Sequence, residues 1–271
     1  MTAPLVTAPL VTAPLVTAPL VTAPLVTARW RAGWLRRRPG CRRPLAAAIP
    51  VPASEEAGSA ALLGAAGVAA AALLRSSFAA EAGSARFYLL TAGLAGTWAG
   101  GALGAGPVSW SGDRWRGRPG SAAVALAVVP AVTGAVTFAA FYGAARVVRR
   151  HRALRRAIAG VLRYADAGST PLVVLIAAGS GVAEELYFHG ALWSGPCPLR
   201  ATTLAYAAST AAAGNPALVL AGLVTSVIFG WQRSASGGVV APAVAHVTWS
   251  VLMLRYLPPL FRDPDPAPSA A

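Results

Sequence analysis

The chain has no lysine, two cysteines and few acidic residues, and each scarcity argues against a class of protein. All 23 basic residues are arginines and only nine residues are acidic, so the formal net charge is +14. Charged residues make up 12% of the chain, against roughly 25% in soluble domains, so a soluble domain is not expected. Cys41 and Cys197 lack a metal-binding spacing, which argues against a cysteine-ligated metal site.

The arginines flank apolar segments, and together with abundant Ala, Gly and Pro they indicate a GC-rich genome. A basic surface that binds nucleic acid would instead gather its arginines on one face of a soluble domain. We therefore predict no nucleic-acid partner.

Apolar segments of membrane-spanning length recur along the chain, which is 56% hydrophobic. They lie at about 59–80, 87–109, 120–145, 170–193, 199–213, 216–232 and 237–257. The fifth is too short to cross a bilayer unaided, so we expect six spans and one re-entrant helix. In the last span, Pro242 predicts a kink. The predicted fold is all-α, a polytopic transmembrane bundle of about six to eight helices that crosses a bacterial plasma membrane several times.

The N-terminal region differs in composition from the rest of the chain. Residues 2–26 are five copies of TAPLV, in which a proline at every fifth position forbids a helix. An arginine-rich stretch and a linker follow. We therefore predict that 1–58 is disordered, that 59–257 is the transmembrane domain, and that 258–271 is a disordered tail.

Two segments predict specific packing. Residues 146–163 carry seven arginines and an apolar stripe, a pattern typical of an amphipathic helix at the membrane surface, and a basic loop between spans is an equal alternative. Gly96, Gly100 and Gly104 are spaced by four residues in the second span. This pattern lets membrane helices pack closely, and we expect it to face the bundle interior rather than a second copy.

Two adjacent carboxylates, Glu184 and Glu185, interrupt the apolar segment 170–193. A charged side chain near the bilayer centre costs at least about 2.5 kcal/mol, so such residues usually have a function. Glu185 and His189 are four residues apart and share a helix face, where they can hydrogen-bond. Glu184 points about 100° away from that face. Two explanations of the buried glutamates are compatible with this pattern: a structural Glu–His pair, or a catalytic or ion-conducting site.

A second polar pair lies in the last apolar segment. His246 is the only ionisable side chain in the middle of that segment, and Ser250 follows four residues later on the same face. A lone histidine in a membrane helix is often a packed, satisfied residue. Here its isolation favours a partnership with one of the buried glutamates.

The sequence around these residues resembles the CAAX-protease and bacteriocin-processing family, called CPBP or Abi. GVAEELYFHGALW is similar to the family's first motif, EExxxR, and GWQRSASGGVVAPAVAHVTWSVLML to its last region, which ends in HxxxN. The similarity covers about residues 165–257. It implies an intramembrane endopeptidase in which Glu184 is the general base, Glu185 its supporting neighbour, and His246 polarises the substrate or stabilises the oxyanion.

Three positions depart from the family pattern. His189 replaces the motif arginine, Ser250 replaces the final asparagine, and the middle motif FxxxH aligns with Tyr206 to Thr210, so its histidine is missing. Ser250 can still donate a hydrogen bond to an oxyanion, whereas a threonine cannot exchange a proton near neutral pH. The departures therefore support an alternative, a catalytically inactive membrane scaffold or peptide-binding immunity protein.

The leading hypothesis is hydrolysis of peptide bonds in membrane-associated peptides or proteins, with catalytic candidates Glu184, Glu185, His189, His246 and Ser250. The preferred mechanism needs no cofactor. Its alternative is a zinc ion held by Glu184, His189 and His246, although no HExxH helix is present. A proton-coupled transporter is disfavoured because the two halves show no inverted repeat.

Overall fold

A computed structural model describes residues 53–111, 121–168 and 170–262, all of which belong to one compact unit, Arg38–Ala271. The predictions for residues 1–52 lie outside the described residues. The described elements are α1 (Ala53–Ala79), α2 (Ala85–Gly104), α3 (Ser121–Val148), α4 (Arg152–Asp166), α5 (Thr170–Glu184), η1 (Glu185–Ala191), α6 (Pro198–Ala211), α7 (Pro216–Ser236), α8 (Val240–Tyr256) and η2 (Pro258–Leu260). The all-helical prediction is confirmed.

The helix ends follow from local sequence signals. Ser84 caps α2 by accepting a hydrogen bond from the Phe87 amide (3.1 Å), and Asn215 caps α7 in the same way. Gly237 ends α7 in a left-handed conformation with φ 79°, which suits glycine. Pro242 lies in the first turn of α8, where its missing N–H removes no intrahelical bond. The predicted cause of a kink is therefore absent.

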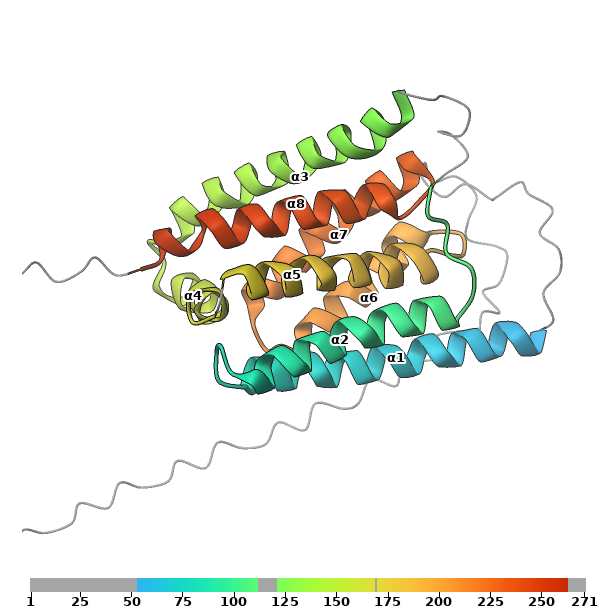
Figure 1. Ribbon diagram of the computed structural model, residues 1–271, viewed down its shortest axis with the longest axis horizontal. Coiled ribbons are helices and arrows are strands. Elements are labelled where there is room, and N and C mark those ends of the chain that lie inside the picture. The colour runs from blue at the N-terminus through green and yellow to red at the C-terminus, as the bar shows by residue number, and fades with distance from the viewer. Residues whose placement is uncertain (1–52, 112–120, 169, 263–271) are drawn as a thin grey trace, which may run out of the picture. The chain divides into compact units, whose positions relative to one another are not determined.

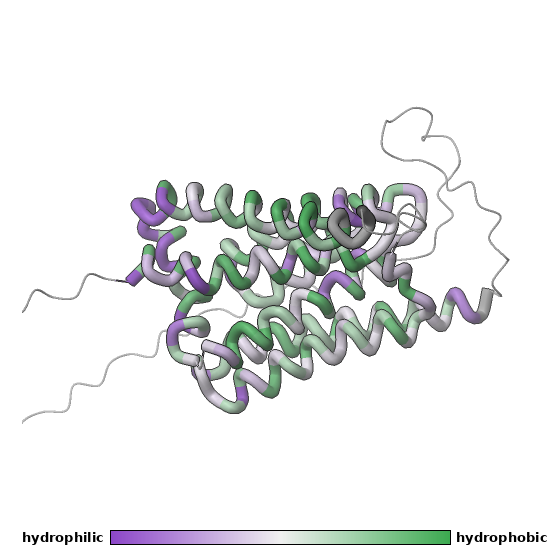
Figure 2. Tube along the Cα trace, turned by 45° about the horizontal axis from the view of Figure 1, so that its top comes forward, coloured by the Kyte–Doolittle hydropathy of each residue, from purple (hydrophilic) through white to green (hydrophobic). Residues whose placement is uncertain are grey.

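Five helices lie side by side in the order α3, α8, α5, α2 and α1, and α6 and α7 lie behind α5 (Figure 1). Four segments of the described chain are long and apolar enough to cross a membrane: Glu55–Ala79, Leu126–Val148, Thr170–Ala191 and Pro216–Ser236. The protein is therefore a multi-pass integral membrane protein, and the described residues contain four such candidate spans where the sequence predicts six. Hydrophobic residues run along the helices, and hydrophilic ones gather toward their ends (Figure 2).

The basic segment 146–163 is not one helix. The chain turns at residues 149–151, so its first part ends α3 and the rest forms α4, which crosses the other helices (Figure 1). Leu162 and Tyr164 of α4 are buried, while Arg152 and Arg156 are exposed. The amphipathic character is as predicted, but it belongs to a shorter helix.

The expected glycine contact uses a different helix face. Gly96 and Gly100 are exposed, and a Cβ atom at either position would meet nothing within 4 Å. The closest approach of α2 to α1 is at Gly101, where a Cβ would lie 2.5 Å from the Ala66 side chain, and at Gly104 a Cβ would lie 3.0 Å from the Leu62 side chain. The prediction that these three glycines pack inside the bundle is therefore wrong for Gly96 and Gly100, and only Gly104 approaches α1.

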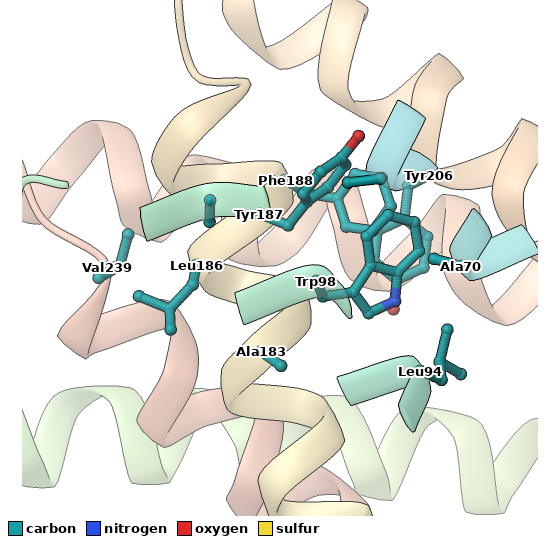
Figure 3. Close-up of a cluster of buried hydrophobic side chains, with 11 residues drawn as sticks. Ala70, Leu94, Trp98, Ala183, Leu186, Tyr187, Phe188, Tyr206 and Val239 are labelled. Carbon is teal, nitrogen blue, oxygen red and sulfur yellow. The ribbon is translucent and has the colours of Figure 1, made fainter. Parts of the chain in front are cut away.

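A cluster of buried side chains joins α1, α2, η1 and α6 (Figure 3). We call it the aromatic cluster after its members Trp98, Tyr187, Phe188 and Tyr206. The Trp98 ring lies 4.3 Å from that of Tyr187 and 5.0 Å from that of Phe188, measured between centroids. Each such aromatic pair contributes about 0.5–1.5 kcal/mol beyond burial alone. The cluster fixes η1, which carries two of the candidate site residues, against α2.

The structured region extends past both predicted boundaries. Helix α1 begins at Ala53, before the expected start at residue 59. At the other end, Leu257 and Phe261 are buried against Ala145 and Leu162, so residues 258–262 are folded rather than part of a disordered tail.

Candidate active site

The helix that carries both glutamates changes geometry between them. α5 ends at Glu184, and the chain continues without a break as a π-helix, η1, from Glu185 to Ala191. The Leu192 amide donates to the Tyr187 carbonyl five residues earlier (2.9 Å), which is the π-helical pattern. Such π segments are often found at functional sites, because the extra residue in the turn redirects side chains.

Glu185 lies between two histidines. One of its carboxylate oxygens is 2.5 Å from Nδ1 of His189, and the other is 2.8 Å from Nδ1 of His246 on α8. All three side chains are buried, and the Glu185 side chain is only 1% exposed. The predicted i, i+4 contact between Glu185 and His189 is confirmed.

The hydrogen bonds determine how His246 is presented. An ionised carboxylate only accepts hydrogen bonds, so Nδ1 of His246 donates to Glu185 and Nε2 is left for another partner. The Phe229 ring lies 5.1 Å from the imidazole, and a Cβ at Gly181 would be 3.1 Å from its Cδ2 atom. The imidazole is therefore held in one orientation from several sides.

Glu184 faces a cavity of about 310 Å³ between the helices. Its carboxylate accepts a hydrogen bond from the Tyr206 hydroxyl on α6. The polar side chains that line this cavity include Ser77, Thr91, Tyr164, Ser180, Glu184, Tyr206, Ser209, Thr210, Thr225, His246 and Ser250. Glu184 and His246 thus border the same cavity, and of the two buried glutamates it is Glu185 that hydrogen-bonds His246.

His189 does not line this cavity. Its Nδ1 is bonded to Glu185, and its buried Nε2 has no hydrogen-bond partner and lies against Gly230, where a Cβ would be 3.2 Å away. Arg233 of α7 donates from Nε to the His189 backbone carbonyl (2.7 Å). These contacts enclose His189 and tie η1 to α7.

The predicted zinc ligands do not fit a metal ion. Both histidines use Nδ1 to bind Glu185, Nε2 of His189 is packed against Gly230, and Glu184 is bonded to Tyr206. Within residues 53–111, 121–168 and 170–262, no group of three His, Cys, Asp or Glu side chains is arranged to hold a metal. We therefore assign no catalytic step to a metal.

Residues 166–252 match the family model described as Rce1-like, Type II CAAX prenyl endopeptidase. The chain contains an Rce1-like domain. This match covers about a third of the chain and includes all five predicted catalytic residues. Comparisons with curated proteins and with solved structures gave no match. The Rce1-like domain comprises α5 to α8, together with the end of α4, so the helices that carry the site are the ones that match.

Two contacts of the Rce1-like domain were not predicted, those of Tyr206 and Arg233. The sequence marks Tyr206 only by its alignment with the phenylalanine of the FxxxH motif. The available signal was a phenol hydroxyl in a helix of the membrane domain, which needs a hydrogen-bond acceptor when it is buried. Arg233 is a charged residue at the end of an apolar segment, and its buried partner is a backbone carbonyl that no sequence pattern marks.

Proposed function

We propose that the protein is an intramembrane endopeptidase that hydrolyses peptide bonds of membrane-associated peptides or proteins. One observation carries the proposal: Glu184, His246 and Ser250 line a single cavity inside a bundle of membrane-length helices. A carboxylate, an imidazole and a hydroxyl around one cavity supply a base and two hydrogen-bond donors for an oxyanion.

In the proposed reaction, Glu184 accepts a proton from a water molecule as its oxygen attacks the substrate carbonyl carbon. A protonated His246 donates from Nε2 to the developing oxyanion while Nδ1 stays on Glu185, and Ser250 donates from its hydroxyl. When the C–N bond breaks, the proton held by Glu184 passes to the leaving amine. Glu185 keeps His246 oriented, the role that a buried carboxylate has in a catalytic triad.

The substrates we propose are peptides at the surface of a bacterial plasma membrane, including bacteriocin-type, immunity or signalling peptides. The name of the family model refers to prenylated CAAX proteins. Most of the cavity lining is apolar, which suits apolar side chains next to the cleaved bond.

A second candidate function is an inactive scaffold that binds a membrane peptide without cleaving it. Thr210 stands where the family resemblance places a histidine, and its hydroxyl donates to the backbone carbonyl of Tyr206 (3.0 Å). It is therefore already committed to its own helix and supplies no acid or base.

Cleavage by purified protein separates these two functions. The wild type and Glu184→Ala would be incubated in lipid vesicles with a set of membrane-tethered peptides, and products identified by mass spectrometry. We expect new peptide termini with the wild type and none with Glu184→Ala. Glu81→Ala, which removes an exposed carboxylate from the turn between α1 and α2, is the control and should cleave normally. Cleavage by Glu184→Ala at the wild-type rate would refute the proposed role of Glu184, and binding without cleavage by the wild type would favour the scaffold.

A further inference from the structure

Tyr206 is the hydrogen-bond donor to the carboxylate that we propose as the base. It lies on α6, is 6% exposed, and directs its hydroxyl to Oε2 of Glu184. Tyr206 and Glu184 both line the cavity. A tyrosine hydroxyl that binds one carboxylate oxygen restricts the rotation of that carboxylate and leaves the second oxygen, Oε1, to meet other groups.

The position of this ring is closely defined by its neighbours. Its centroid is 4.5 Å from that of Phe188 on η1. On the other side, a Cβ at Gly222 of α7 would lie 2.9 Å from ring atoms Cδ1 and Cε1 of Tyr206. Only a residue without a side chain lets α7 approach so closely, so the ring has little freedom to move away from Glu184.

The neighbouring phenol shows that this contact is specific. Tyr187 belongs to the same aromatic cluster, but its hydroxyl donates to the Leu63 backbone carbonyl (2.6 Å) and its side chain is not part of the cavity wall. A hydroxyl that only needed a buried acceptor could use a backbone carbonyl, as Tyr187 does. Tyr206 instead binds the one carboxylate that faces the cavity.

We propose that Tyr206 is the positioning residue of the base, holding Glu184 through Oε2 so that Oε1 faces the attacking water. This inference rests on the proposed function and extends it to a residue outside the glutamate and histidine positions. Thr210, one turn further along α6, offers no second donor to Glu184, because its hydroxyl binds its own helix. Tyr206 is therefore the side chain of α6 that orients the base.

The test compares Tyr206→Phe with Tyr187→Phe, each of which removes one hydroxyl from the same cluster. In the peptide cleavage assay we expect Tyr206→Phe to lower kcat about 10- to 100-fold with little change in KM, since a misoriented base slows the chemistry without weakening binding. Tyr187→Phe should keep the wild-type kcat. Equal losses of thermal stability in the two variants would show that the difference in kcat is not a folding effect.

An infrared measurement gives a readout that does not need turnover. The difference spectrum between the wild type and Glu184→Gln isolates the carboxyl bands of Glu184, and these should shift in Tyr206→Phe but not in Tyr187→Phe. A wild-type kcat in Tyr206→Phe, or an unshifted band, would overturn the positioning role while leaving the proposed function intact. If the wild type and all variants are inert, the proposed function fails, and the band alone decides whether Tyr206 holds Glu184.

Discussion

Replacing Glu185 with alanine should destabilise the protein far more than replacing Glu184. Glu185→Ala removes the carboxylate between two buried histidines and leaves both Nδ1 atoms without a partner. Removing one partner of a buried pair costs about 3–5 kcal/mol. At about 2–4 °C per kcal/mol for a domain of this size, the unfolding midpoint should fall by about 6–20 °C.

The control is Glu184→Ala, which breaks one hydrogen bond and leaves the Tyr206 hydroxyl at the cavity surface. That loss is about 1–2 kcal/mol, or about 2–8 °C. The eight tryptophans make intrinsic fluorescence during heating in detergent a suitable assay. A midpoint for Glu185→Ala equal to that of Glu184→Ala would refute the interpretation of Glu185 as the buried centre of the site.

Two further predictions concern the cavity and the metal. Gly222→Ala should displace the Tyr206 ring and reduce peptide cleavage at least tenfold, because the new Cβ would lie 2.9 Å from that ring. The control is Gly179→Ala, where the new Cβ would have no neighbour within 4 Å, and this variant should cleave normally. Equal rates in these two variants would contradict the packing argument. A chelator such as EDTA should leave cleavage unchanged while Glu184→Ala abolishes it, and loss of activity restored specifically by zinc would show that a metal takes part.

The helices were largely predictable because apolar segments of membrane-spanning length carry a strong signal. Segment 170–193 was predicted within two residues of its observed end at Ala191. The turn at 149–151 was missed because arginine favours a helix and nothing in the pattern required a break. The glycine ladder failed for a different reason: Gly96 and Gly100 have the right spacing, but the rotation of α2 is set by the aromatic cluster around Trp98.

The sequence predicts which residues form the site better than it predicts which of them hydrogen-bond to one another. Glu184, Glu185 and His246 stood out because each is an ionisable side chain in an apolar segment. Which glutamate faces α8 depends on the local helix geometry, and the change to a π-helix at Glu185 is not encoded in a simple residue period. The Tyr206 contact depends on how α6 packs against α5, which no single-helix pattern specifies.

The measurement that tests the account most directly is the cleavage rate of Glu184→Gln, which keeps the size of the side chain and the possibility of a bond to Tyr206 but removes the base. General-base catalysis contributes about 10²- to 10⁴-fold, so kcat should fall by that factor while the unfolding midpoint stays within a few degrees of the wild type. A Glu184→Gln protein that is folded and cleaves its peptide at the wild-type rate would contradict the claim that Glu184 activates the water.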